Sequence, residues 1–172
     1  NFAFALRKAG WQGSIKLFDA DPTLPYHRPP LSKAYLTSAD AIDKNLLKAA
    51  ETYQKDNIEL NLGIKVGSIE RDAQVIQLEN GEQVAYDKLV IATGARPFIP
   101  PIEGIDNAHN LYPLRTAQDV ENIRQAFANS ANKRVVIIGG GYIGLETAAS
   151  LKKLGGDVTV LEREQRILAR VT

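Results

Sequence analysis

The chain has 172 residues, 44% of them apolar and 24% charged, which is the composition of a folded globular protein with one large domain or two small ones. Its 21 basic and 20 acidic residues give a formal charge of +1, so nucleic acid is not an expected partner. Cysteine is absent, which excludes disulfides, thiolate metal ligands and a cysteine nucleophile within these residues, and no metal site is expected. No apolar run approaches the roughly 18 residues of a membrane helix, so we expect a soluble, cytoplasmic protein without a membrane partner.

Residues 1–21 predict a helix, a strand and then an acidic residue. The sequence LRKAG at residues 6–10 aligns with LKKLG at residues 151–155 at a constant offset of 145 (151 − 6 = 145). Both segments have the pattern of helix ends that lead into strands. A glycine motif matching residues 139–144 would then fall just before Asn1, so the chain is expected to be a fragment that begins inside a first βαβ unit. The alternative is a chance likeness between two basic amphipathic helices.

The segment PYHRPPLSKAYL at residues 25–36 has a backbone restricted by its prolines. Ser32 is expected to cap a helix, which places Lys33 at a helix start, where a cation costs roughly 0.3–1 kcal/mol. Lys33 is therefore expected to have a negatively charged partner, and the alternative is a solvated lysine on a loop. His27 is interpreted as a packing or surface residue and not as a ligand or a base.

Residues 46–94 predict one helix followed by four short strands. The helix is expected at residues 46–56. Asn80-Gly81 indicates a hairpin between the second and third strands, because both residues tolerate positive φ. The proline-rich sequence at residues 96–101 cannot continue a strand or a helix and is expected to be a linker. The four strands are expected at residues 65–69, 74–78, 83–86 and 89–92.

The clearest pattern in the chain lies at residues 133–165, KRVVIIGGGYIGLETAASLKKLGGDVTVLEREQ. A short β-branched run predicts a buried parallel strand that meets glycines at once, and helical spacing of apolar residues follows. Gly155-Gly156 ends the helix, and a second strand comes next. The elements are expected at residues 114–129 (a leading helix), 135–138 (strand), 142–154 (helix) and 158–161 (strand).

GGGYIG at residues 139–144 fits the dinucleotide-binding pattern GxGxxG in the strand–turn–helix context that the pattern requires. Gly139 permits the tight turn, Gly141 lets the backbone approach a pyrophosphate, and Gly144 lets helix and strand pack closely. The helix N-terminus, at Tyr142 and Ile143, offers free N–H donors to an anion. The alternative is an ordinary glycine turn without a ligand.

Glu162 follows the second strand, 18 residues after Gly144 (162 − 144 = 18), where a carboxylate accepts hydrogen bonds from the ribose of an adenine dinucleotide. Its charge disfavours a 2′-phosphate, so NADH is predicted over NADPH, although the adjacent Arg163 could soften this preference. In the first unit either Asp19 or Asp21 could hold the equivalent ribose. The repeat alignment, with a short insertion ahead of the strand, selects Asp19.

Four sequences in order, PYHRPPLSKAYL, LVIATGARP, LRTAQD and VVIIGGGYIGLE followed by VTVLEREQRILARVT, together resemble the FAD-dependent NADH:ferredoxin reductases. These form the putidaredoxin and rhodocoxin reductase branch of the pyridine nucleotide–disulfide oxidoreductase superfamily. The resemblance spans essentially the whole chain and implies an α/β fold. Residues 1–110 would form a Rossmann-like FAD domain with a β-meander and a missing first strand. Residues 111–172 would form the opening βαβ unit of a Rossmann-like NAD-binding domain.

The resemblance also implies contacts with both cofactors. It places Asp21 at the FAD ribose, and we prefer Asp21 over Asp19 because the loop after this strand differs between the two units. Glu146 is implied as the acid that reaches Lys33, and the two are taken as the catalytic pair beside the flavin ring. The other implied FAD contacts are Arg28 near the phosphates, Val66 beside the adenine, and Thr93, Gly94 and Arg96 along the cofactor.

The resemblance further implies an electron-transfer function. Reductases of this kind take a hydride from NADH onto FAD and pass electrons singly to an iron–sulfur protein, such as a [2Fe–2S] ferredoxin or a Rieske-type protein. The proline-rich run stands where disulfide reductases carry a redox cysteine pair, so dithiol chemistry is excluded. Two alternatives are an apoptosis-inducing-factor-like flavoprotein with a signalling or assembly role, and a non-catalytic nucleotide-binding fragment. The fragment alone is expected to be inactive and not to hold FAD tightly.

Overall fold

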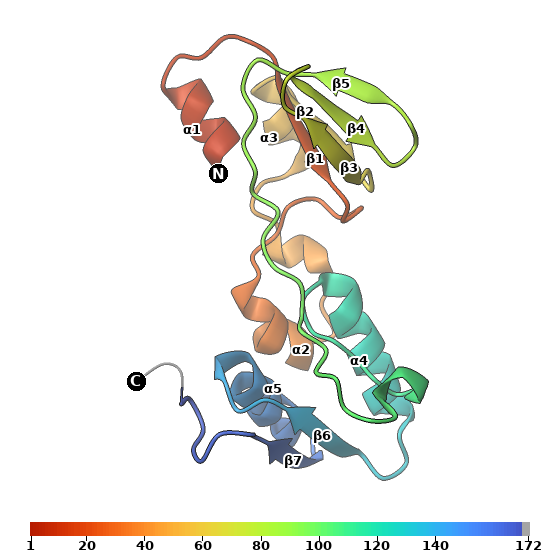
Figure 1. Ribbon diagram of the computed structural model, residues 1–172. Helices are drawn as coiled ribbons and strands as arrows, with labels where there is room; N and C mark the ends of the chain where they lie inside the picture. Colours follow the sequence, from red (N-terminus) through yellow and green to blue (C-terminus); the bar gives the residue numbers. More distant parts are fainter. Residues whose placement is uncertain (170–172) are drawn as a thin grey trace. The chain divides into compact units, whose positions relative to one another are not determined.

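The computed structural model describes residues 1–169, which form two compact units (Figure 1). Unit 1 contains Asn1–Tyr26 and Leu46–Gly94, and unit 2 contains His27–Asn45 and Ala95–Thr172. The segment His27–Asn45 therefore packs with the C-terminal half of the chain. The predicted division near residue 110 concerns cofactor domains, and it stays a prediction.

Unit 1 contains a pair of parallel strands flanked in the sequence by short helices. Strand β1 (Ile15–Asp19) pairs with β2 (Ile58–Leu62) from Ile15 opposite Ile58 to Asp19 opposite Leu62. Helix α1 (Phe2–Lys8) precedes β1, and α3 (Ala50–Lys55) precedes β2. The helix and strand predicted at the start of the chain are confirmed. Strand β2 was not predicted, although its sequence IELNL alternates apolar and polar residues.

Helix α3 is shorter than the helix predicted at residues 46–56. Leu46 forms a β-bridge with Tyr26, and the Leu47 N–H donates to the Pro25 carbonyl over 2.8 Å. Residues 46 and 47 thus satisfy backbone groups against another segment, and this pairing replaces the first turn of a helix.

A three-stranded antiparallel meander completes unit 1 (Figure 1). It consists of β3 (Val66–Glu70), β4 (Val75–Leu78) and β5 (Gln83–Ala85), close to the predicted ranges. The predicted hairpin is confirmed, because Gly81 has φ +89° and the Glu82 N–H donates to the Asn80 side chain over 3.0 Å. Ile76 and Leu78 on β4 are buried.

Residues 89–92 do not form a strand, so this prediction is wrong. Val90 and Ile91 are exposed, and among residues 1–169 no strand pairs with them. An apolar β-branched run becomes a strand only where a neighbouring backbone supplies partners for its N–H and C=O groups.

A single guanidinium joins the C-terminal ends of α1 and α3. Arg7 Nε donates to the Asp56 carbonyl over 2.7 Å, and Nη2 donates to the Asn57 carbonyl over 2.8 Å. Its Nη1 donates to the Trp11 and Gly13 carbonyls, each over 2.8 Å. The Trp11 ring lies against Gly13, so closely that a β-carbon there would overlap it. Arg7 thus orders both helix ends and the loop before β1.

Unit 2 contains the predicted βαβ unit. Strands β6 (Arg134–Ile138) and β7 (Asp157–Leu161) are parallel neighbours in register from Arg134 opposite Asp157 to Ile138 opposite Leu161. Helix α5 (Tyr142–Lys153) connects them, and α4 (Ala117–Asn129) precedes β6. Thr116 and Asp119 form a capping box at the start of α4. The remaining elements are the short helices η1 (Pro29–Ser32), α2 (Ala34–Thr37), η2 (Ile42–Asn45) and η3 (Ile105–Asn107).

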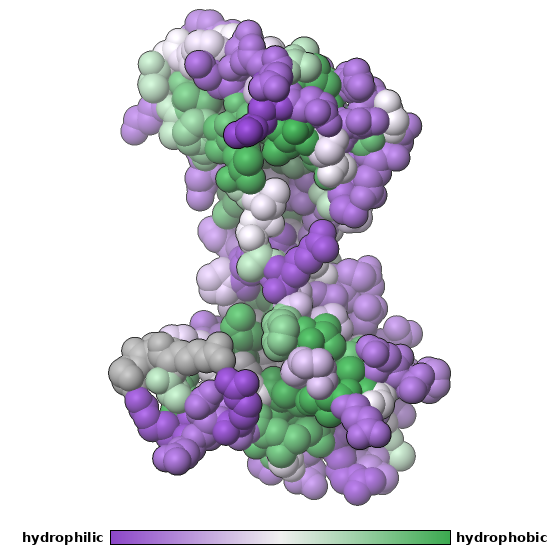
Figure 2. Space-filling model, in the orientation of Figure 1, coloured by the Kyte–Doolittle hydropathy of each residue, from purple (hydrophilic) through white to green (hydrophobic). Residues whose placement is uncertain are grey.

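The core of unit 2 lies where α2 contacts both α4 and α5. Tyr35 and Leu36 of α2 are buried there, together with Val120 of α4 and Leu151 of α5. Helix α5 also packs on β7. Apolar side chains nevertheless reach the surface of this protein (Figure 2), and those on the β6–β7 pair are Val136, Ile138 and Leu161. Within residues 1–169, no helix is both long enough and apolar enough to span a lipid bilayer.

Candidate functional site

The glycine turn, residues 139–144, links β6 to α5 in a conformation that depends on its glycines. Gly139 has φ +113°, in the left-handed region that favours glycine, and its N–H donates to the Leu161 carbonyl over 2.8 Å. A β-carbon at Gly144 would overlap the Gly139 carbonyl oxygen. The space beside Gly141 is open within residues 1–169, since no atom of these residues lies within 4 Å of an added β-carbon. Among residues 1–169, no side chain caps the first turn of α5, so the N–H groups of this turn have no side-chain acceptor.

Glu162 is held against the glycine turn by backbone hydrogen bonds. Its Oε2 accepts from the Gly140 N–H over 2.7 Å, and its Oε1 accepts from the Glu164 N–H over 2.9 Å. The Arg163 guanidinium is exposed and pairs with Glu164 over 2.9 Å.

This arrangement fits the pyrophosphate and ribose of an adenine dinucleotide. The turn offers a backbone without side chains at Gly141, an open helix N-terminus and a fixed carboxylate after the neighbouring strand. Tyr142 and Ile143 begin the helix with exposed side chains. The residues present therefore fit an adenine dinucleotide, and their role in binding it stays a prediction.

A second cluster within unit 2 brings together Lys33 and Glu146, as expected. Lys33 Nζ lies 2.9 Å from Glu146 Oε1, which confirms the predicted negative partner. The Ser32 hydroxyl donates to Glu146 Oε2 over 2.6 Å, and the Ser150 hydroxyl donates to the Ser32 carbonyl over 2.7 Å. Both carboxylate oxygens of Glu146 are thus engaged by the two residues that precede α2.

The prediction that Ser32 caps a helix is wrong. Helix α2 begins after Lys33, which is itself the N-cap and makes no side-chain capping bond. The Ser32 hydroxyl is committed to the Glu146 carboxylate, an ionised acceptor that forms a stronger hydrogen bond than a neutral one. Ser32 and Ser150 were not identified as site residues from the sequence, since each contacts a partner more than 100 positions away.

The Ser32 hydroxyl, and after it the Lys33 ammonium, hold the pKa of Glu146 below its ordinary value. Glu146 is therefore a carboxylate at neutral pH. The side chains of Lys33 and Glu146 are 53% and 30% exposed, so the ion pair lies at the surface of unit 2, within reach of a ligand.

The other residues predicted to bind FAD are distributed over the two units. Arg28 of unit 2 donates to the Arg115 carbonyl over 3.0 Å, and Arg96 is exposed. In unit 1, Val66 is half-buried at the start of β3. Thr93 and Gly94 are exposed, and Gly94 has φ +69°.

The two candidate ribose acids of unit 1 both take part in local hydrogen bonds. Asp19 Oδ1 accepts from the Asp21 N–H over 2.9 Å. Asp21 accepts from the Thr23 N–H over 3.0 Å and from the Tyr26 hydroxyl over 2.8 Å. These contacts orient both carboxylates, and the choice between Asp19 and Asp21 stays a prediction.

Parallel strands joined by a helix, with a glycine turn at the first strand end and an acid at the second, define an α/β dinucleotide-binding protein. The family model described as pyridine nucleotide-disulphide oxidoreductase matches residues 1–172. The chain belongs to this family, and the α/β fold predicted from the sequence is confirmed.

Two curated relatives and one solved structure support the predicted resemblance. Putidaredoxin reductase CamA from Pseudomonas putida is 43% identical over 172 residues, which are 99% of this chain and 40% of the relative. Rubredoxin-NAD(+) reductase from Pseudomonas putida is 41% identical over 171 residues, which are 99% of this chain and 44% of the relative. The crystal structure of a covalent putidaredoxin reductase–putidaredoxin complex matches with a TM-score of 0.90 and 43% identity, over 99% of this chain and 41% of the reductase. The chain thus spans less than half of the length of these relatives.

Proposed function

We propose that the full-length protein is an NADH-dependent flavoprotein reductase, a ferredoxin–NAD(+) reductase in class. It would transfer electrons from NADH through FAD to an iron–sulfur protein such as a [2Fe–2S] ferredoxin or a Rieske-type protein. The observation that carries the proposal is the glycine turn with Glu162 fixed against it, in a chain 43% identical to a reductase of this kind. Bound FAD supplies the redox chemistry, since it accepts a hydride and releases electrons one at a time.

In this proposal the glycine turn and Glu162 bind NADH. Gly139 and Gly144 shape the turn, and Gly141 leaves the space in which the pyrophosphate approaches the N–H groups at Tyr142 and Ile143. Glu162 accepts hydrogen bonds from the adenosine ribose and repels a 2′-phosphate, so NADH is preferred over NADPH.

Lys33 and Glu146 form the proposed catalytic pair. The Lys33 ammonium would lie beside the flavin ring, where a fixed cation raises the electron affinity of the ring. Glu146 holds that ammonium in place and, by pairing with it, moderates its field. In unit 2, Arg28 and Arg96 are the further proposed FAD contacts, and in unit 1 they are Asp21, Val66, Thr93 and Gly94.

The proposal includes a division of labour along the chain, with residues 1–110 in the FAD-binding domain and residues 111–172 in the NAD-binding domain. It also includes a cytoplasmic location, which cell fractionation would test. Titration of the full-length, FAD-loaded protein with NADH under anaerobic conditions tests the reductase proposal directly. We expect the flavin absorbance to bleach and an added [2Fe–2S] ferredoxin to be reduced. A flavin that NADH leaves oxidised would contradict the proposal.

Substitution of Glu162 tests the assignment of the NAD site. Glu162→Ala removes hydrogen bonds of about 1.5–3 kcal/mol each and the repulsion of a 2′-phosphate, so kcat/KM for NADH should fall relative to NADPH. Glu162→Gln keeps an acceptor for the Gly140 N–H and so separates the ligand contact from the loop contact. Glu59→Gln, an exposed carboxylate on β2, is the control. An unchanged or increased preference for NADH in both Glu162 variants would remove Glu162 from the site.

A further inference from the structure

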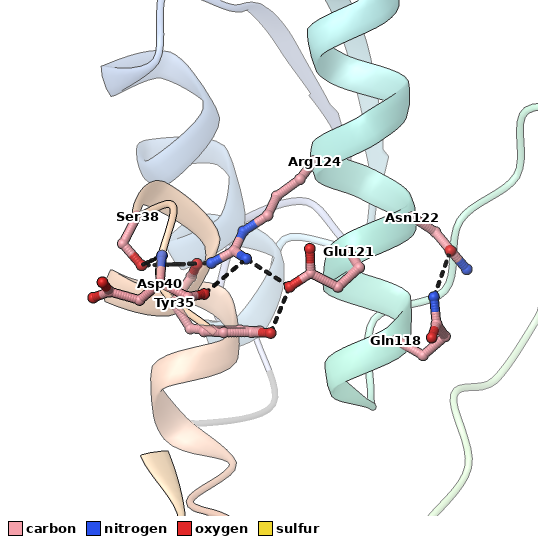
Figure 3. A network of polar contacts seen from close by, with 7 residues as sticks. All are labelled: Tyr35, Ser38, Asp40, Gln118, Glu121, Asn122 and Arg124. Atoms are coloured by element: carbon pink, nitrogen blue, oxygen red, sulfur yellow. Dashed lines mark hydrogen bonds and ion pairs between the residues drawn. The ribbon is translucent and has the colours of Figure 1, made fainter. Parts of the chain in front are cut away.

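A polar network around the buried Tyr35 joins α4 to α2 (Figure 3). The Tyr35 hydroxyl donates to Glu121 Oε1 over 2.5 Å, and Arg124 Nη1 donates to the same oxygen over 2.6 Å. The Arg124 guanidinium also lies 4.1 Å from the centre of the Tyr35 ring, within the range of a cation–π contact. Tyr35, on α2, is therefore held by two charged side chains of α4.

The same guanidinium fixes the residues that follow α2. Arg124 Nη1 donates to the Asp40 carbonyl over 3.2 Å, and Nη2 lies 3.5 Å from Ser38 Oγ. The Arg124 side chain is only 16% exposed, and its buried Nε has no hydrogen-bond partner among residues 1–169. Burying a guanidinium in this way is costly, and apolar residues of similar volume would pack α2 onto α4 without that cost. The network therefore contributes a defined orientation of α2, which packing alone would leave less defined.

Helix α2 carries Lys33 at its N-cap, two positions before Tyr35. Helix α5 supplies Glu146 as the partner of the Lys33 ammonium and Ser150 as the donor to the Ser32 carbonyl. A helix of four residues has little stability of its own, so its orientation is set by these tertiary contacts. Any rotation of α2 would move the Lys33 side chain relative to Glu146.

We propose that Tyr35, Glu121 and Arg124 are positioning residues that hold α2 in the orientation in which the Lys33 ammonium meets Glu146. The part of this inference that concerns catalysis rests on the proposed function, in which Lys33 lies beside the flavin. The part that concerns the position of Lys33 is independent of any cofactor.

The test measures the position of Lys33 directly, by its rate of acylation with an amine-reactive ester, read by mass spectrometry of peptides from the full-length protein. An ion-paired ammonium must leave its partner and lose its proton before it reacts. Tyr35→Phe removes the hydroxyl but keeps the ring under Arg124, and Arg124→Lys keeps the charge but loses the planar fork. Glu146→Gln gives the rate for unpaired Lys33. Asn122→Ala is the matched control, since it removes an exposed hydrogen bond to Gln118 from the same helix (Figure 3).

In both Tyr35→Phe and Arg124→Lys, Lys33 should be acylated about threefold to tenfold faster than in the unsubstituted protein, which is the factor expected for one lost hydrogen bond. The acylation rate of Lys153, at the end of α5, should stay unchanged. Asn122→Ala should leave the Lys33 rate unchanged. In the FAD-loaded protein, the same two variants should shift the flavin reduction potential and lower kcat more than they change KM for NADH. A Lys33 rate in Tyr35→Phe equal to that in Asn122→Ala would overturn the proposal, and Tyr35→Phe decides alone if Arg124→Lys does not fold. Acylation needs no flavin. The acylation rates therefore still test the position of Lys33 if the reductase proposal is wrong.

Discussion

Helices α1 and α5 end in the same way, although one lies in each unit. Gly10 and Gly155, at the offset of 145 (155 − 10 = 145), have φ +91° and +88°. The hydrogen bonds that close the two turns also correspond at this offset, so the predicted repeat is confirmed at the helix ends. In α1 they run from the N–H groups of Ala9, Gly10 and Trp11 to the carbonyls of Ala5, Arg7 and Leu6, and in α5 from Leu154, Gly155 and Gly156 to Ser150, Lys152 and Leu151.

The connections that follow these helix ends differ, and so does the way each is fixed. In unit 2 only Gly156 lies between Gly155, where the helix end closes, and β7. A β-carbon at Gly156 would lie 2.9 Å from the Leu151 carbonyl oxygen. In unit 1 residues 11–14 lie between Gly10 and β1. Arg7 donates hydrogen bonds to two carbonyl oxygens of this longer loop. Lys152 aligns with Arg7, but within residues 1–169 it makes no side-chain hydrogen bond. A short connection is thus fixed by the absence of a side chain, and a longer one by a side chain with several donors.

The largest effect is expected at Gly144, the last residue of the glycine turn, which lies in the first turn of α5. Gly144→Ala should destabilise the protein by about 3 kcal/mol or more, because the added carbon overlaps the Gly139 carbonyl oxygen in a tightly packed turn. Gly141→Ala is the control, with open space and φ −81°, and should change stability by less than about 1 kcal/mol. Urea denaturation gives both values. Equal losses in the two variants would show that the turn does not depend on the close approach at Gly144.

The next largest effect on stability is expected at Arg7, which binds the loop before β1, and not at Lys152, which aligns with it before β7. Arg7→Ala should cost about 2 kcal/mol, because it removes hydrogen bonds to the carbonyls of Trp11 and Gly13 after α1 and of Asp56 and Asn57 after α3, some of which water can replace. Lys152→Ala should change stability by less than about 0.5 kcal/mol, as for an exposed surface residue. The two variants are compared by chemical denaturation. Similar losses would mean that the guanidinium does not order the longer loop.

A matched pair of substitutions tests whether the two helix ends are also alike in energy. Gly10→Ala and Gly155→Ala should each cost about 1 kcal/mol, because both residues have positive φ and neither β-carbon would meet an atom within 4 Å. Their difference in unfolding free energy should stay below about 0.5 kcal/mol. A large difference would show that the two turns are alike in backbone conformation but not in energy.

The smallest effect concerns a charge on α5 without a counterpart on α1, since Glu146 aligns with Asn1 (146 − 145 = 1). Ser32→Ala should raise the pKa of Glu146 toward its ordinary value, which NMR of the carboxyl carbon would measure. A lowered pKa stabilises the fold above the ordinary pKa of the group, and this stabilisation is lost as pH falls through the folded value. The variant should therefore lose about 0.5 kcal/mol near neutral pH, and its stability should depend less on acid, given the partial exposure of the group. Thr37→Ala, on α2, should leave the pKa of Glu146 unchanged.

The sequence predicted the βαβ unit and the meander because their signals are local. Strand 135–138, the glycines and Glu162 follow one another within one short segment, and Asn80-Gly81 marks its own hairpin. The prediction of a strand at residues 89–92 was wrong because strand formation there depends on a neighbouring backbone. The role of Ser32 was wrong for a similar reason, since its partner Glu146 is 114 positions away. A negatively charged partner for Lys33 was predicted because a cation is unfavourable at a helix start, and the family resemblance identified this partner as Glu146.

Trp11 allows the unfolding of unit 1 to be followed separately by fluorescence. It is the one tryptophan of the chain, it belongs to unit 1, and its ring lies against Gly13 in the loop that Arg7 binds, with 51% of the residue exposed. Its emission in this chain therefore reports the unfolding of unit 1, while circular dichroism reports the helices of both units. If the units unfold independently, a substitution in the glycine turn will shift the dichroism transition and leave the emission transition in place, so that the stability of each unit can be read from a single sample.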